Sequence, residues 1–293
     1  MTAGIPIQVI LPVIIAMLML GIGMSLRIAD FSALISHPRA TGLGLLNLFV
    51  IFPALAFLFA WIFPLPPELR VGLVLLAACP SASTSNFFTY LARGDVALSI
   101  TLTAISKIVP VLTVPFYVSL AAALFADTDT SLTLSFADTS ERLLHMVLLP
   151  TVIGMALRHR FPAVAEHTQR SVKRLAVIAL VLLIAALIIR ERTSLAQMLL
   201  SAGLPALSLC LAGMLFAFVS STQFGLQEPR RNAITIEVGM QSGGTAIAIA
   251  AGILAQPAMA IPAAVYSLLM YGVAAGFVYW QRSALASPRL QSE

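Results

Sequence analysis

A short polar segment inside a long apolar stretch carries residue types that could do chemistry. Residues 235–245 hold one carboxylate, Glu237, one carboxamide, Gln241, three glycines and three hydroxyls. A carboxylate at membrane depth costs about 2.5 kcal/mol or more and usually faces an ion, a partner or a water-filled cavity. Glu237 and Gln241 are four residues apart, so on a helix they share a face. We therefore predict a cation or polar-solute site here; the competing interpretation is a kinked helix whose glutamate reaches the interface.

Two further segments place polar groups at helical spacing. In residues 75–86, Pro80 removes a helical hydrogen bond and a run of hydroxyls follows before Asn86. Ser99, Thr103 and Lys107 are spaced by four, so they lie on one helical face. A lysine at that depth needs a counter-ion or a cavity. Paired polar, Gly- or Pro-interrupted segments are the best sequence indication of a transporter's binding site.

The composition determines the class of protein that must position these groups. Hydrophobic residues make up 59% of the 293 residues and charged residues 10%, and the mean hydropathy is +0.97. These values predict an all-α polytopic membrane protein. The net charge is +5, but the basic residues fall in short loops, which indicates membrane topology and not nucleic-acid binding. Cys79 and Cys210 lie in apolar runs, which favours buried thiols over a disulfide.

Apolar runs predict one transmembrane domain over residues 1–293, with nine spans. The run at 5–26 has no basic residue before it and is long for a signal peptide, so it is interpreted as the first span. With the N-terminus outside and the C-terminus in the cytoplasm, twelve Lys or Arg residues fall inside and four outside. The predicted spans are 5–26, 39–63, 68–92, 95–125, 141–158, 172–190, 196–220, 230–255 and 261–281.

The two interrupted spans, 68–92 and 230–255, are each the middle of a triplet and run in opposite directions. One helix precedes the first triplet and two precede the second. This count predicts an inverted repeat of four plus five helices, equivalent to a five-plus-five repeat whose first helix is missing.

Residues 79–99 and 236–241 resemble the two crossover segments of the bile acid:sodium symporter family, and the resemblance extends through nearly the whole chain. It implies two crossing broken helices, a core domain and a panel domain. The panel then comprises the spans 5–26, 141–158 and 172–190. The core comprises the helices within 39–125 and 196–281.

The resemblance also implies Na⁺ as the coupling ion. The first sodium site falls on Ser85, Asn86, Ser99, Thr103 and Glu237, all of the expected type. The second site falls on Glu237, Val238, Met240 and Gln241, with Val238 and Met240 acting through their carbonyls. Its remaining ligand, a glutamine in the family, is replaced by Leu48, and the neighbouring Asn47 points about 100° away on a helix. We therefore expect one sodium site, with the second doubtful, and a role for Lys107 as a surrogate cation near the vacated position.

The substrate region departs from the family pattern. A polar His-Asn pair becomes Met270 and Tyr271, and an Asn becomes Ser242. With Ser83 and Thr84, these residues are the expected substrate-facing set. The implied substrate is a small organic anion, such as a bile-acid-like, steroid-conjugate or pantoate-like carboxylate.

The sequence thus predicts a sodium-coupled symporter of the plasma (inner) membrane that works by alternating access, with the lipid bilayer as its surroundings. Proton-coupled or uncoupled transport, with Lys107 replacing one sodium, is an alternative, as is export of an anion or of a metalloid through Cys79. A channel is disfavoured because no charge ring is visible. An enzyme is disfavoured because Glu237 has no second carboxylate or histidine in a matching position. No transition-metal spacing occurs, and the oligomeric state is open.

Overall fold

The structure is a computed structural model that describes residues 7–125, 141, 144–169, 171–172, 174–175, 178 and 192–286. Within these ranges the regular elements are helical, apart from one isolated antiparallel bridge between Ser81 and Gln241. Three described helices are long and apolar enough to cross a membrane, Pro38–Ile62, Leu200–Gln223 and Pro257–Ser283. The predicted all-helical class is confirmed, and these helices agree with a membrane protein. The count of nine spans and the inverted repeat stay predictions, and most of the predicted span 172–190 lies outside the described residues.

Short helices and breaks make up much of the chain. The α-helices are α1 (Ile7–Gly23), α2 (Ser32–Ser36), α3 (Pro38–Leu46), α4 (Phe52–Ile62), α5 (Pro67–Ala78), α6 (Ser85–Leu91), α7 (Val96–Ser106), α8 (Pro110–Phe125), α10 (Leu149–Arg160), α12 (Arg192–Gln223), α13 (Glu228–Gly239), α14 (Gly243–Ala248) and α15 (Ile261–Ala286). The π-helical segments are η2 (Asn47–Ile51), η3 (Leu144–Leu148) and η4 (Ile249–Ile253), and the 3-10 segments are η1 (Ile28–Phe31) and η5 (Pro257–Ala260).

Both predicted broken spans are broken in the structure. Residues 79–84 separate α5 from α6 at Pro80, and residues 240–242 separate α13 from α14 before two glycines. The predicted span 95–125 is also interrupted, because a turn over residues 107–109 separates α7 from α8. Pro110 is the physical reason: it lacks an N–H donor, and it disfavours helical geometry at the residue before it.

Prolines also explain two π-helical segments. Segment η2 ends two residues before Pro53, and η3 ends two residues before Pro150. Pro53 has no N–H to give to the carbonyl of Phe49, four residues earlier. The hydroxyl of Tyr117 on α8 donates to that carbonyl instead, at 2.5 Å. The side chain thus replaces the missing backbone bond and ties the widened turn to a second helix.

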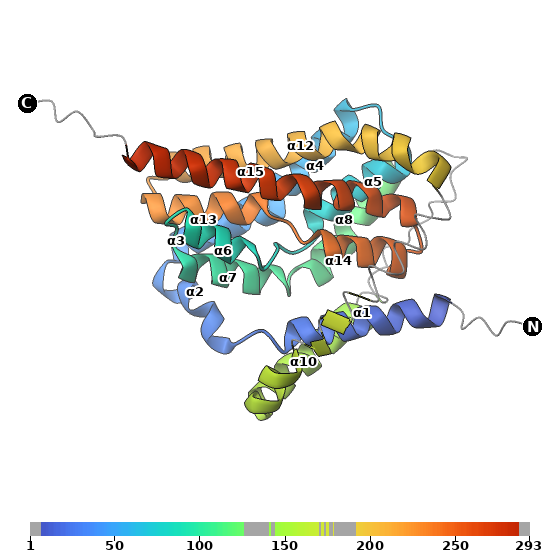
Figure 1. The fold of residues 1–293 in the computed structure, drawn as a ribbon, viewed down its shortest axis with the longest axis horizontal. Helices are drawn as coiled ribbons and strands as arrows, with labels where there is room; N and C mark the ends of the chain where they lie inside the picture. Colours follow the sequence, from blue (N-terminus) through green and yellow to red (C-terminus); the bar gives the residue numbers. More distant parts are fainter. Residues whose placement is uncertain are drawn as a thin grey trace, which may run out of the picture.

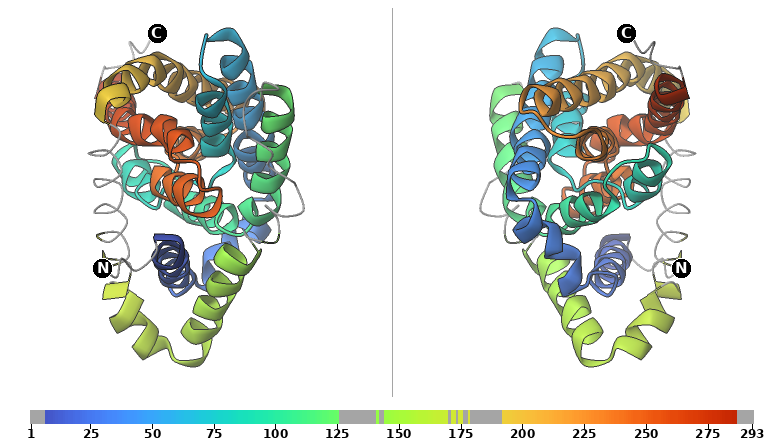
Figure 2. Two further views of the ribbon diagram at one scale, coloured as in Figure 1. Left: turned by 90° about the vertical axis from the view of Figure 1, so that its right-hand side faces the viewer. Right: turned by 90° about the vertical axis from the view of Figure 1, so that its left-hand side faces the viewer.

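The helices form a main body with a separate pair beside it. Figure 1 shows α12 and α15 on one side of the broken elements α13, α14, α6 and α7, and α1 with α10 on the other side. The two end views agree that α1 and α10 lie together on one side of the main body, which α1 contacts at η4 (Figure 2). The predicted division into a core and a panel remains a prediction.

Glycine allows α1 and α10 to approach closely. A Cβ on Gly154 would lie 2.4 Å from the carbonyl oxygen of Leu20, and one on Gly23 would lie 2.1 Å from that of Thr151. Small residues at such crossings are how helices pack in membranes, where backbone proximity gives the attraction.

We expect Gly154→Ala to destabilise the protein by about 1–3 kcal/mol, because the backbone of α1 cannot yield without losing its packing on α10. The midpoint of thermal unfolding in detergent measures this loss. Gly42→Ala is the matched control, since nothing lies within 4 Å of the added Cβ. Equal unfolding midpoints for Gly154→Ala and wild type would show that the crossing is not tightly packed.

Candidate functional site

The two broken helices contact each other at their breaks. The amide of Ala82 donates to the carbonyl of Met240 at 2.7 Å, and the amide of Ser242 donates to the carbonyl of Pro80 at 2.8 Å. Backbone groups in a helix break have no helical partner, so a buried break needs others. Here the backbone groups of each break form hydrogen bonds with those of the other break. This pairing brings Glu237, one turn before its own break, against residues 81–85.

The Glu237 carboxylate is fully buried and is surrounded by hydroxyls from the first break, the start of α6 and α7. Ser81 and Thr103 donate to Oε1, each at 2.5 Å. Ser85 and Ser99 donate to Oε2, at 2.7 and 2.8 Å. All four donors are neutral. Burying a carboxylate is costly unless its charge is also compensated, so this arrangement suits a bound cation or a proton.

Asn86 joins the same cluster through its side-chain oxygen. Its Oδ1 lies 2.8 Å from Ser99 Oγ and 3.3 Å from Thr103 Oγ1. Only the short turn over residues 92–95 separates α6 from α7, so the two helices pack side by side. Asp95 ends this turn and caps α7 by accepting from the amide of Leu98 at 3.0 Å. Residues 86 and 103, which the sequence predicts to come together, are thus neighbours on α6 and α7.

The cluster around Ser99 and Thr103 has more hydrogen-bond acceptors than these two hydroxyls have protons to satisfy. Ser99 and Thr103 carry one hydroxyl proton each. Both hydroxyls lie within hydrogen-bonding distance of the Glu237 carboxylate and of Asn86 Oδ1. Each proton can satisfy one of these acceptors well, so lone pairs are left over. A cation that accepts lone pairs would complete the site.

Two serines of this site were missed by sequence reasoning. Ser81 Oγ lies between Glu237 Oε1 and Ser106 Oγ, which is 2.9 Å away, and Ser106 Oγ also accepts from the Ser81 amide at 3.2 Å. Ser106 follows Ser99 by seven residues, which is two helical turns. That spacing places Ser106 on the same face of α7 as Ser99, so the sequence pattern could have identified it. Nothing in the sequence alone distinguishes Ser81 from the other hydroxyls after Pro80.

The residues proposed to bind a second cation make different contacts from those of the first site. Gln241 is buried. Its amide nitrogen donates to the carbonyl of Val238 at 2.9 Å, and its Oε1 has no partner among the residues that the structure describes. The carbonyl of Met240 already accepts from Ala82. Leu48 lies on η2 and is buried.

Asn47 does not replace the missing side chain at position 48. Its amide donates to the carbonyl of Leu43 at 2.9 Å, and its oxygen accepts from Ser220 at 3.3 Å. The expectation that Asn47 points elsewhere agrees with these contacts. Besides the shared Glu237 carboxylate, the second set therefore offers carbonyls and one amide oxygen that has no partner among the described residues.

The five residues expected to face a substrate do not form one surface. Ser83 and Thr84 are exposed in the first break, whereas Met270 is buried in the core. The hydroxyl of Ser242 is 2.8 Å from that of Thr245. The Tyr271 ring is partly exposed and its centre lies 6.0 Å from that of Phe88. In this conformation Met270 therefore faces other side chains and not an open cavity.

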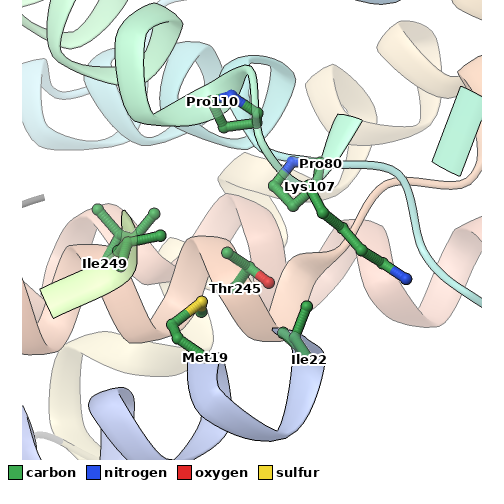
Figure 3. Close-up of a pocket in the computed structure, with 8 residues that line it drawn as sticks. Met19, Ile22, Pro80, Lys107, Pro110, Thr245 and Ile249 are labelled. Carbon is green, nitrogen blue, oxygen red and sulfur yellow. The ribbon is translucent and has the colours of Figure 1, made fainter. Parts of the chain in front are cut away.

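Lys107 lies in the turn after α7 and lines a small pocket with a cavity volume of about 20 Å³. Such a volume holds about one water molecule. Figure 3 shows the lysine side chain extending from beside Pro80, with Ile22 of α1 and Thr245 of α14 nearby. The predicted surrogate role of Lys107 stays a prediction. The remaining lining residues are Met19, Pro110, Val147 and Ile249.

Comparison with known proteins identifies the family. The model of the sodium bile acid symporter family matches residues 12–198. The chain belongs to this family. The family resemblance predicted from residues 79–99 and 236–241 is confirmed, and the predictions of transport, sodium dependence and a membrane location agree with it.

Three proteins similar to this chain are named as transporters or cotransporters. The chain is 32% identical over 272 residues to the probable sodium/metabolite cotransporter BASS1, chloroplastic, of Arabidopsis thaliana, covering 91% of this chain and 65% of that protein. It is 29% identical over 260 residues to the uncharacterized sodium-dependent transporter YocS of Bacillus subtilis (strain 168), covering 87% and 78%. It is 29% identical over 273 residues to the probable sodium/metabolite cotransporter BASS2, chloroplastic, of Oryza sativa subsp. japonica, covering 92% and 63%. The chain thus spans slightly less than two thirds of the two plant proteins.

Proposed function

We propose that this protein imports a small organic anion across the inner membrane together with Na⁺, by alternating access. The observation that carries the proposal is the excess of oxygen acceptors around the buried Glu237 carboxylate. The proposed sodium ligands are Ser85, Asn86, Ser99, Thr103 and Glu237, and we add Ser81 because it contacts the same carboxylate.

The chemistry of these ligands favours a metal cation over a proton. A proton needs a single acceptor, whereas a hard cation takes six or more oxygen ligands in proteins, as for Ca²⁺. Two carboxylate oxygens, one carboxamide oxygen and four hydroxyls converge here from four segments of chain. Such a set has one negative charge, which matches a monovalent cation. The relatives named as sodium-dependent point to Na⁺.

The position of this site supports coupling to a second solute. Glu237 lies beside the crossing of the two breaks, which transporters use for both coupling ions and substrates. The pair α1 and α10, on one side of the main body, is part of the proposed panel against which the core would move (Figure 2). The substrate is proposed to be a small carboxylate. Metalloid export through Cys79 is disfavoured, since that thiol is buried.

The test is uptake of radiolabelled organic acids by proteoliposomes under an inward Na⁺ gradient. A tenfold gradient supplies about 1.4 kcal/mol per ion, so one coupled Na⁺ can concentrate the anion about tenfold. Protein-free liposomes and an equal K⁺ gradient are the controls. Uptake driven equally well by K⁺, or by a pH gradient alone, would contradict sodium coupling.

A further inference from the structure

A second polar cluster lies where α1 and α10 end. A pocket with a cavity volume of about 600 Å³ opens between the end of α1, the α7–α8 turn and the segment formed by η3 and α10. This volume is within the range of small-molecule and cofactor sites. Its walls are mainly apolar and share no residue with the proposed sodium site. The apolar lining includes Leu26, Ile108, Leu148, Val152 and Met155.

One end of this pocket is basic, because Arg27, Arg158 and His159 line it. Arg158 is only 9% exposed, and its Nη1 is buried and has no hydrogen-bond partner within the described part of the chain. Its Nη2 lies 3.7 Å from the carboxylate of Glu166, which is also 3.9 Å from Arg27. One carboxylate therefore serves two guanidinium groups. A buried N–H without a partner costs about 1–3 kcal/mol, so this end is suited to a further anion.

The apolar side of the pocket continues onto the outer surface of α10. Val152 lines the pocket and is half exposed, and Leu149 and Ile153 beside it are similarly exposed. An occupant with an anionic head and an aliphatic body fits both ends of this surface. The basic end also lies where α1 and α10 finish, which the distribution of Lys and Arg predicts to be the inner interface.

We propose that this pocket binds the phosphate of an anionic phospholipid, with its acyl chains along α10. Guanidinium groups bind phosphate through paired, charge-assisted hydrogen bonds, and Arg158 Nη1 has no hydrogen-bond partner among the residues that the structure describes. Basic pockets between membrane helices on the cytoplasmic side are where acidic lipid head groups bind. A lipid here bridges α10 and the α7–α8 turn, so it contacts both the separate helix pair and the main body. The inference does not depend on the proposed sodium coupling.

The test uses the purified full chain and two lipids with identical acyl chains, phosphatidylglycerol and phosphatidylcholine, with bound lipid counted by native mass spectrometry. Wild type should prefer phosphatidylglycerol, by about fivefold for each basic residue engaged, which is the equivalent of about 1 kcal/mol. Arg158→Gln should remove most of that preference. Arg160→Gln is the matched control, because Arg160 is at the same helix end but stacks on Phe161 and does not line the pocket.

A gain-of-binding variant guards against a folding defect in Arg158→Gln. Glu166→Gln removes the competing carboxylate and should strengthen phosphatidylglycerol binding. If Arg158→Gln and Arg160→Gln lose the phosphatidylglycerol preference equally, the lipid is held only by general electrostatic attraction. That result would overturn the proposed site. So would the absence of any lipid preference in wild type. Displacement of phosphatidylglycerol by a soluble organic acid, dependent on Arg158, would assign the pocket to the transported solute instead.

Discussion

Glu237→Gln is expected to abolish sodium-dependent uptake. Four hydroxyls are directed at the carboxylate, which supplies the only full negative charge among the proposed sodium ligands. Removing one partner of a buried ion pair costs about 3–5 kcal/mol, which corresponds to sodium binding weaker by at least about 100-fold. The amide would also place an NH₂ group, a donor, among hydroxyls that now donate to an acceptor. Uptake assays and sodium binding to the purified protein measure both effects.

The thermal stability of the Glu237→Gln variant distinguishes a loss of sodium binding from a loss of folding. Without Na⁺, the variant should be as stable as wild type or more stable, because an uncompensated buried charge has been removed. Added Na⁺ should raise the unfolding midpoint of wild type, since a ligand that binds only the folded state stabilises it, and should leave the variant unchanged. Glu228→Gln is the matched control, in the first turn of the same helix α13. Full sodium-dependent uptake by Glu237→Gln would contradict the assignment of this carboxylate.

Local chemistry explains which features the sequence could predict. Pro80 and the glycines after Gln241 remove helical bonds or weaken helices wherever they occur, so the two breaks follow from the residues themselves. The contact between Asn86 and Thr103 follows from a short turn between two helices, since few residues leave few ways to connect them. In each case the cause lies within a few residues of its effect.

Features that depend on tertiary packing could not be predicted in the same way. Ser81 contacts Glu237 because the two breaks pair through their backbones, and that pairing joins residues about 160 positions apart. Met270 is buried because α15 turns that face to the core, which periodicity in an apolar helix does not show. The split at Pro110 was predictable in principle, but the continuous apolar run from 95 to 125 favoured one helix.

The ligands missing from the second cation position should set the number of Na⁺ ions transported with each anion. Leu48 gives this position an apolar side chain, and Asn47 is held by Leu43 and Ser220. Apart from the Glu237 carboxylate, the side-chain acceptor offered there is Gln241 Oε1, which is buried and has no partner among the described residues. The Glu237 carboxylate already accepts from four hydroxyls, so an added amide oxygen and carbonyls leave a second Na⁺ undercoordinated. We therefore expect one Na⁺ per anion, with a Hill coefficient of about one, since this coefficient is limited by the number of sites.

Leu48→Gln should restore the missing ligand and move the Hill coefficient for Na⁺ from about one toward two, because η2 packs against α13, which carries Val238. The ratio of ²²Na⁺ to anion taken up by proteoliposomes provides an independent count. Burying the new amide costs about 1–3 kcal/mol unless it finds a partner, so the variant should be less stable without Na⁺ and recover as Na⁺ is added. Leu48→Met is the matched control, since it keeps the volume and adds no oxygen ligand. A wild-type ratio of two, or a Leu48→Gln variant that folds but still transports one Na⁺, would show that position 48 does not set the stoichiometry.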